Sequence, residues 1–446
     1  MPTPAVEQLG PSFRRVVTRE ILKDAGGSSF GEWTSGRQTD ALSTNAGASA
    51  LPFQRWHRFK EAFSPELIAQ AVRNSPISVR RLADPFGGSG TSALAAQFLG
   101  VEPTTVEVNP FLADLISAKL ASYRTSTLLT ALNRVTRKAR GSRYRGADMI
   151  RLLPITFVEP GFKDRWLFDM QVAIEIFRLR KAIQEEADVD VKRLFRVLLG
   201  GLIVELSNAV VSGKGRRYRK NWQERPVDPR CVIPTFSKAV GSAIVEITAC
   251  SARPVQTSTV LHGDSRVLFS KIEPVDLIVC SPPYPNSFDY TDVYNMELWM
   301  LGYLTSAEAN RLLRRSTLTS HVQVAREFAA PPKTRTLNKT MKQLNAIAGD
   351  LWDERLPLMV GGYFADLQTL LQASAKLLPR HGQAWFVVGD SQYANIQVPV
   401  AEVLSEIAPN VGFKVERITP FRSMRVSPQQ SGRHMLSEDL VVFSRI

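Results

Sequence analysis

The strongest constraint on the fold is a strand, a glycine-rich turn and a helix predicted in succession by SVRRLADPFGGSGTSALAAQFLG, residues 78–100. A second short strand follows in PTTVEVNP, which completes a strand–helix–strand unit. Such a unit indicates a parallel sheet, because the crossover helix returns the chain in the same direction. Further strands are predicted by TVLHGDSRVL, VDLIVCSPPY, AWFVVGDS, FKVERI and DLVVFSR. We therefore expect an α/β fold.

The chain divides by composition and hydrophobic periodicity into one α/β domain and three other segments. Residues 1–50 are rich in Ser, Thr, Gly and Ala, which predicts a mostly irregular N-terminal arm. Residues 122–254 and 303–357 carry helical patterns that interrupt the strands, so we expect two helical insertions. The α/β domain is then formed by residues 51–121 and 255–446, with the second insertion inside it.

The chain carries a formal net charge of +14 and has a pI of about 9.8. The surplus is concentrated in the predicted insertions. Residues 134–230 contain 22 Lys and Arg against 12 Asp and Glu, and residues 305–345 contain 8 against 2. This distribution indicates a polyanionic partner, nucleic acid before membrane, with a generally basic soluble protein as the alternative.

The three cysteines lie far apart and form no paired motif: Cys231, Cys250 and Cys280. Neither a disulfide framework nor a metal site is predicted, and a reducing cytoplasm fits. The first ten residues lack an apolar signal core, and the longest apolar stretch, residues 198–211, is too short to span a bilayer. We therefore expect a cytoplasmic protein with no membrane partner and no metal. Cys280 closes an apolar run and is interpreted as core packing.

The turn DPFGGSGTS predicts a ligand site at the end of the first strand. Glycines let the backbone turn tightly and let a ligand approach closely, although a purely structural turn is the alternative. No Lys follows the turn, which excludes the GxxxxGKS/T loop of nucleoside triphosphate sites. Glu107 ends the next strand, where a carboxylate can bind both hydroxyls of a ribose. The pattern fits a nucleoside ligand without a phosphate, such as S-adenosylmethionine.

A further carboxylate is a candidate for the same ligand. Asp264 lies at the end of the third predicted strand, in HGDS, and could contact the adenine. A solvated turn residue is the alternative for this position.

The run DLIVCSPPYPNSFDY, residues 276–290, predicts a buried strand that ends in two residues without a backbone N–H. The amino group of cytosine or adenine is a poor nucleophile, because its lone pair is delocalised into the ring. The Ser281 hydroxyl oxygen and the Pro282 carbonyl could accept hydrogen bonds from that amino group and free the lone pair. Tyr284 offers a flat face on which an extruded base can stack. The segment thus predicts methyl transfer to a base, with a rigid turn as the alternative.

The motifs DPFGGSGT and SPPY resemble motifs I and IV of the amino-group DNA methyltransferases, which make N4-methylcytosine or N6-methyladenine. AFSPELI is similar to the motif that precedes motif I, and EVNP resembles motif II. The resemblance is specific over residues 59–120 and 258–300 and loose over 360–446. It implies a Rossmann-like, S-adenosylmethionine-dependent methyltransferase fold with a mostly parallel seven-stranded sheet, and double-stranded DNA whose target base is flipped.

The resemblance also implies roles for the residues that match these motifs. The catalytic residues would be Ser281, Pro282, Pro283 and Tyr284. The cofactor site would be formed by Phe63, Asp84, Phe86, Gly87, Gly88, Gly90, Thr91 and Glu107. SPPY rather than DPPY favours cytosine N4 as the target, with adenine N6 left open. The long insertion after the second strand departs from the family's usual scheme, which puts in doubt which segment reads the DNA sequence.

The first insertion, a candidate target-recognition region, contains cations interleaved with aromatic rings in SGKGRRYRKNW, residues 212–222. Cations for phosphates and rings for bases are the expected mix for nucleic-acid contact. The candidate nucleic-acid-binding residues are Lys214, Arg216, Arg217, Tyr218, Arg219, Lys220 and Trp222. A solvated charged loop is the alternative, and residues 305–345 form a second candidate surface with a weaker pattern.

These predictions together describe a site-specific DNA methyltransferase that uses S-adenosylmethionine. It could be the protective half of a restriction-modification or other defence system, with a cognate restriction endonuclease as partner. Two other functions stay open. An RNA methyltransferase acting on guanine N2 would usually carry a recognisable RNA-binding domain at one end, and the sequence indicates none. A non-catalytic nucleic-acid-binding module of the same fold is the other, and an intact SPPY argues against it.

Overall fold

The computed structural model describes residues 29–45, 47–59, 61–212, 215–286, 288–424 and 435–446. Residues 1–28 of the predicted arm lie outside this range. The rest of that segment contains a short helix, α4 (Phe30–Trp33), and the 3-10 helix η1 (Ala48–Ala50), joined by turns. Trp33 is buried and stacks on Phe98 of the α/β domain, with ring centroids 4.6 Å apart. This part of the chain is therefore packed against the domain.

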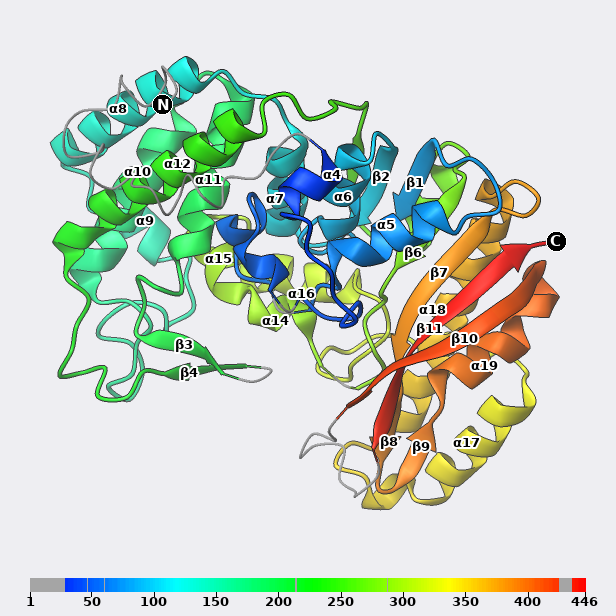
Figure 1. Cartoon of the computed structure of the whole chain (residues 1–446). Helices are drawn as coiled ribbons and strands as arrows, with labels where there is room; N and C mark the ends of the chain where they lie inside the picture. Colours follow the sequence, from blue (N-terminus) through cyan, green and yellow to red (C-terminus); the bar gives the residue numbers. More distant parts are fainter. Residues whose placement is uncertain (1–28, 46, 60, 213–214, 287, 425–434) are drawn as a thin grey trace.

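Seven strands form one sheet, whose labelled strands lie in the right half of the view in Figure 1. They are β1 (Arg81–Asp84), β2 (Glu102–Glu107), β5 (Thr259–His262), β6 (Leu277–Cys280), β7 (Gln383–Gly389), β10 (Phe413–Met424) and β11 (Leu436–Arg445). Their order is β10-β11-β7-β6-β1-β2-β5. The five strands from β5 to β7 are parallel, whereas β11 runs antiparallel between β7 and β10. The predicted α/β fold with a mostly parallel seven-stranded sheet and helical insertions is confirmed.

The strand order creates a switch point at the centre of the sheet. The chain runs outward from β1 through β2 to β5, and then returns to place β6 on the other side of β1. In open α/β sheets, ligands bind in the crevice at the carboxyl ends of the strands where the order reverses in this way. Asp84 ends β1 and Ser281 directly follows β6, so the fold brings the two predicted motifs together.

Helices cover both faces of the sheet. One face packs against α5 (Pro65–Arg73), α6 (Thr91–Phe98) and α7 (Pro110–Leu120), and the other against α13 (Ser265–Leu268), α17 (Arg335–Ala346), α18 (Leu356–Leu377) and α19 (Val400–Ile407). In β6, Leu277 and Val279 belong to the first core, whereas Ile278 and Cys280 belong to the second. A strand buried on both faces must be apolar throughout, which explains the run LIVC.

The first insertion forms a helical lobe beside the sheet, coloured cyan to green in Figure 1. It contains α8 (Thr125–Gly141), α9 (Ala147–Ile150), α10 (Met170–Gln184), α11 (Val189–Leu202), the strands β3 (Ala209–Ser212) and β4 (Gly215–Tyr218), η3 (Pro229–Cys231) and α12 (Val232–Ala249). The antiparallel β3–β4 hairpin was not predicted, because its short strands lie inside a mainly helical pattern.

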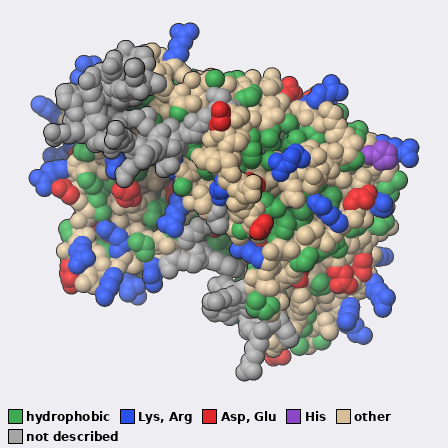
Figure 2. All heavy atoms as spheres, viewed as in Figure 1, with side chains coloured by type: hydrophobic (Ala, Val, Ile, Leu, Met, Phe, Trp, Pro, Cys, Tyr) green, Lys and Arg blue, Asp and Glu red, His purple; other side chains and the backbone are tan. Residues whose placement is uncertain are grey.

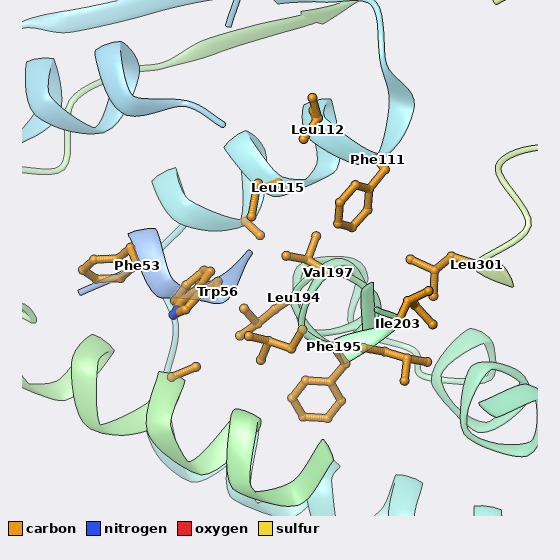
Figure 3. Packing of buried hydrophobic residues seen from close by; sticks show 14 of the residues in the cluster. Phe53, Trp56, Phe111, Leu112, Leu115, Leu194, Phe195, Val197, Ile203 and Leu301 are labelled. Atoms are coloured by element: carbon orange, nitrogen blue, oxygen red, sulfur yellow. The ribbon is translucent and has the colours of Figure 1, made fainter. Parts of the chain in front are cut away.

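The helical lobe shares one continuous core with the sheet domain. Leu194 and Val197 of α11 lie close to Leu115 and Phe111 of α7 (Figure 3). Gly200 allows this approach, because a Cβ there would lie 2.3 Å from Phe111 Cε2. Interlocked packing of this kind holds the lobe on the sheet domain, so its surface is fixed relative to the central crevice.

The remaining elements are short helices and one further hairpin. They are η2 (Gln54–Trp56), η4 (Phe269–Lys271), α14 (Tyr290–Val293), α15 (Asn295–Met300), α16 (Ala307–Arg315), η5 (Ala348–Asp350), η6 (Ala408–Val411) and the hairpin of β8 (Ser391–Tyr393) and β9 (Ile396–Val398). The segment between α16 and α17 has no helix or strand and reaches the crevice, which gives the second insertion a part in the site.

Among the described residues, one helical stretch, Pro229–Ala249, has the length and apolar composition needed to cross a membrane. Of its apolar window, 56% is buried inside the protein. Phe236, Val240 and Ile244 belong to the core that the helical lobe shares with the sheet domain. The apolar character of this stretch is therefore explained by packing within the protein.

Candidate active site

A cavity of about 400 Å³ lies at the carboxyl ends of β1, β2 and β6. Its walls come from N-terminal residues such as Phe59 and Phe63, the glycine turn, the end of β2, the segment after β6, the C-terminal hairpin formed by β10 and β11, and the second insertion. Most of the predicted site residues line it, namely Phe63, Asp84, Phe86, Gly87, Gly88, Thr91, Glu107, Ser281, Pro282, Pro283 and Tyr284. The residues predicted for the cofactor and those predicted for catalysis therefore face one space.

The glycines of the turn occupy two different environments. Gly88 has a φ of +52° and faces the Phe59 ring, which a Cβ would approach to 3.2 Å. Gly90 has a φ of +80° and lies behind the turn, where a Cβ would be 2.9 Å from Ile116 Cγ1. Gly90 is not among the cavity residues, so its contribution is the close packing of α6 on α7. The backbone that a ligand can approach is that of Gly87 and Gly88.

Glu107, at the end of β2, is buried at the cavity wall. Its Oε2 accepts a hydrogen bond from the Gly88 N–H at 2.7 Å, and its Oε1 accepts one from the Asn109 N–H at 2.8 Å. Burial raises the pKa of Glu107 to about 7, because the ionised form loses its hydration. Each oxygen keeps a second lone pair that can accept a hydrogen bond from a ligand hydroxyl.

A second buried carboxyl group, Asp84, lies in the same wall. It accepts hydrogen bonds from the Phe86 N–H at 2.8 Å and from the Ser92 hydroxyl. Burial raises the pKa of Asp84 to about 6, and repulsion from Asp84 contributes to the raised pKa of Glu107. A pair of carboxyl groups held in this way favours a ligand that carries positive charge.

Lys119 of α7 holds the glycine turn through hydrogen bonds, a role that sequence reasoning missed. Its ammonium donates to the Ser89 carbonyl at 2.7 Å and to Gln54 Oε1 at 2.9 Å. The side chain is almost completely buried, and burial lowers the pKa of Lys119 to about 7. The only signal in the sequence was a lysine near the end of the mainly apolar helix α7.

The segment after β6 contacts the C-terminal hairpin, which is the antiparallel pair of β10 and β11. Ser281 Oγ lies 3.4 Å from the Tyr284 hydroxyl, which donates to Glu438 Oε1 at 2.9 Å. Arg422 pairs with Glu438, donating from Nε at 2.5 Å and from Nη2 at 3.0 Å. Gly389 leaves room for the tyrosine ring, since a Cβ there would lie 2.5 Å from Tyr284 Cε2. Arg422 and Glu438 both lie outside the strand segments that the sequence predicted, FKVERI and DLVVFSR, and the sequence analysis gave neither residue a role.

The second insertion closes another side of the cavity. Its contribution consists of Ser316, Thr317, Leu318, Ser320 and His321. Asp289, which follows the SPPY segment, pairs with Arg314 of α16. Burial lowers the pKa of His321 to about 4, so this imidazole is neutral at physiological pH. The insertion is therefore tied to the loop that carries the predicted catalytic residues.

Asp264 does not line the cavity. Its carboxylate caps α13 by accepting from the Arg266 N–H at 2.9 Å, and it pairs with the Arg266 guanidinium at 2.7 Å. Its neighbours Gly263 and Ser265 do line the cavity. A ligand contact from this segment would therefore come from those two residues.

Around the β3–β4 hairpin, some of the predicted nucleic-acid-binding cations point into the protein and others point to solvent. Arg216 points inward and pairs with Glu297 at 2.7 Å, and the two side chains are 13% and 1% exposed. Arg217 and Lys220 are exposed. Lys and Arg side chains gather on the face of the helical lobe that carries this hairpin (Figure 2). Lys214 lies outside the described residues.

The aromatic residues and the last arginine of the same run are held by local contacts. Tyr218 stacks on Trp222, with ring centroids 5.1 Å apart and an interplanar angle of 26°. Trp222 also meets Trp166 edge to face. Arg219 donates to Asn208 Oδ1 at 3.2 Å. These contacts fix the end of the hairpin.

Known proteins resemble this chain over most of its length. It is 26% identical over 419 residues to the type II methyltransferase M.AvaI of Nostoc sp. The match covers 86% of this chain and 84% of that protein. It is also 23% identical over 429 residues to the type II methyltransferase M.BsoBI of Geobacillus stearothermophilus. This match covers 85% of this chain and 82% of that protein. Among solved structures, the rRNA methyltransferase aviRa of Streptomyces viridochromogenes matches with 12% identity over 97% of this chain and 96% of its own, at a TM-score of only 0.30. No protein-family model matches the chain.

Proposed function

We propose that the protein is a site-specific DNA methyltransferase that transfers a methyl group from S-adenosylmethionine to the exocyclic amino group of a flipped base. The observation that carries this proposal is that Glu107 and the Ser281–Tyr284 segment face one cavity at the switch point of the sheet. Similarity to type II methyltransferases over most of the chain supports DNA as the substrate. SPPY favours cytosine N4 as the target, with adenine N6 second.

The residues around the cavity fit S-adenosylmethionine. Glu107 has a free lone pair on each oxygen for the two ribose hydroxyls, and the Gly87–Gly88 backbone allows close approach. Phe63 and Phe86 supply apolar surface, and the carboxyl group of Asp84 suits a cationic ligand. When bound, S-adenosylmethionine would supply a methyl group activated by the positive charge on its sulfur.

The chain's own contribution to the reaction is to prepare the amino nitrogen. Ser281 Oγ and the Pro282 carbonyl would accept hydrogen bonds from the two amino hydrogens, which draws the nitrogen out of the plane of the base and frees its lone pair. Proline has no N–H, so neither Pro282 nor Pro283 places a backbone donor beside those acceptors. Tyr284 would hold the ring of the base, so positioning supplies much of the rate.

We assign residues 122–254 as the target-recognition region. Its core is continuous with the sheet domain, and its hairpin presents Arg217 and Lys220 to solvent. Arg216 is excluded from this surface by its ion pair with Glu297. An enzyme of this kind would protect its host DNA from a cognate restriction endonuclease.

Expression in a host that lacks DNA methylation, followed by sequencing with modification detection, tests the proposal. We expect one modified base within one short recognition sequence. Methylated RNA with unmodified DNA would favour an RNA methyltransferase, and no modification of either would favour a non-catalytic binding module.

Affinity for S-adenosylmethionine should fall about tenfold between about pH 8 and about pH 6. The pKa of Glu107 is raised to about 7, and only the ionised group offers acceptors on both oxygens, so binding requires that its proton leave. Calorimetry in buffers of different ionisation enthalpy should detect the released proton. Glu107→Gln is the control, because it removes this titration and leaves that of the ligand's own amino group. Wild-type affinity with the same pH dependence as the variant would exclude Glu107 from the ribose site.

Replacing Arg217 and Lys220 together with Ala should weaken binding to any duplex and lower the slope of log affinity against log salt by up to about 1.8. Each exposed cation that contacts a phosphate releases counterions on binding. Lys376→Ala, which removes an exposed cation on α18, is the matched control. A loss confined to the cognate sequence would indicate a base contact instead, and unchanged binding would mean that the hairpin is a solvated surface.

A further inference from the structure

Two side chains from the segment after β6 and one from β11 form one polar line in the wall of the cavity. Ser281 Oγ lies 3.4 Å from the Tyr284 hydroxyl, and that hydroxyl donates to Glu438 Oε1 at 2.9 Å. Tyr284 and Glu438 are 154 residues apart in sequence. Glu438 lies on β11, and its side chain is only 2% exposed. A buried carboxylate is therefore linked to the predicted catalytic Ser281 through the Tyr284 hydroxyl.

Glu438 forms an ion pair with an arginine of the neighbouring strand. Arg422 of β10 donates two hydrogen bonds to it, at 2.5 Å and 3.0 Å, and an arginine guanidinium stays protonated in proteins. A register shift between Pro420 and Arg422 places Arg422 directly opposite Glu438 in the hairpin. Irregularities of this kind re-aim side chains beside active sites.

An ionised carboxylate accepts hydrogen bonds and donates none, which fixes the direction of the whole line. The single hydrogen of the Tyr284 hydroxyl must point at Glu438, so the tyrosine oxygen can only accept from Ser281. The Ser281 hydrogen then points at Tyr284, away from the space for the base. The lone pairs of Ser281 Oγ are left to face an amino N–H.

We propose that Glu438 is a positioning residue that orients the Tyr284 and Ser281 hydroxyls so that Ser281 presents an acceptor to the target amino group. This inference rests on the proposed function. Without the carboxylate, the Tyr284 hydrogen is free to point at Ser281, and the serine hydrogen then turns toward the amino group. Two hydrogens facing each other repel, so the amino group loses one of the acceptors that free its lone pair.

Glu438→Gln tests this orientation. An amide can donate to the tyrosine oxygen, which permits the wrong direction while preserving the size of the side chain. We expect kcat for DNA methylation to fall about 10- to 100-fold, as for other groups that orient a residue in direct contact, with KM for both substrates nearly unchanged. Glu416→Gln, on exposed Glu416 of β10, is the matched control and should keep wild-type kcat.

Tyr284→Phe provides a second and independent test. It removes the hydroxyl that connects Glu438 to Ser281 and keeps the ring on which the base would stack. We expect a fall in kcat similar to that of Glu438→Gln, and the double variant should be no slower than Tyr284→Phe alone, because both changes break the same line. A merely structural role for Glu438 would instead give losses that multiply in the double variant.

Wild-type kcat in either single variant, or multiplied losses in the double variant, would overturn the positioning role. If Glu438→Gln does not fold, Tyr284→Phe alone decides, since wild-type kcat in that variant rules out the line. Failure of the proposed function is recognised separately, because the wild-type protein would then methylate no DNA at all.

Discussion

Ser281→Ala is expected to lower kcat for DNA methylation by about 100- to 1000-fold, the size of effect seen when one preorganised hydrogen-bonding group is removed from a reacting centre. The hydroxyl oxygen is the one side-chain acceptor that the SPPY segment offers to the amino group. Its contact matters most when the nitrogen lone pair is being freed, so the loss should appear in the transition state rather than in binding.

Single-turnover kinetics with separate measurement of cofactor and DNA affinity checks this prediction. Both affinities should stay within about twofold of wild type, because the cavity loses only one oxygen atom. Ser405→Ala is the matched control, since that hydroxyl bonds to a carbonyl of its own helix, α19. A Ser281→Ala enzyme with wild-type kcat would contradict the proposed chemistry.

Arg216→Ala is expected to destabilise the folded protein by about 3–5 kcal/mol, the usual cost of removing one partner of a buried ion pair. Glu297 is only 1% exposed and would be left without its cation. The sequence predicted a phosphate contact for Arg216, whereas the structure assigns it to the junction between the hairpin and α15. Replacing it therefore tests stability before it tests DNA binding.

The cost of Arg216→Ala should depend on pH. Burial raises the pKa of Glu297, and Arg216 opposes that rise, so removing Arg216 raises the folded-state pKa further. A carboxyl group whose pKa is raised by folding contributes stability at low pH and loses it as the pH rises through the folded pKa. The deficit relative to wild type should thus be smaller at about pH 5 than at about pH 8.

Urea unfolding at both pH values measures this deficit, with Arg217→Ala as the matched control. Arg217 is the next residue on β4, but its side chain is exposed, so its replacement should leave stability within about 0.5 kcal/mol of wild type. Equal stability of the two variants would show that the ion pair with Glu297 contributes nothing to folding.

The sheet was predictable because its information is local. Each strand of the sheet was predicted from a short local segment of the sequence. The glycine turn between the first strand and its helix predicted the crossover that makes the sheet parallel. The switch point then follows from strand order, so residues such as Asp84 and Ser281 could be expected to meet. The β3–β4 hairpin was missed because its four-residue strands are too short to show their period of two inside a helical region.

The sequence by itself determined the α/β fold, the turn, and the residue types that surround the cavity. Only the tertiary structure decided which charges face solvent and which face each other. Arg216 and Arg217 look alike in sequence, but the alternation of a strand sends one to Glu297, 81 residues away, and the other to solvent. Glu438 reaches Tyr284 across 154 residues in the same way. Spacing along the chain encodes local periodicity, whereas such pairings depend on how separate elements pack together.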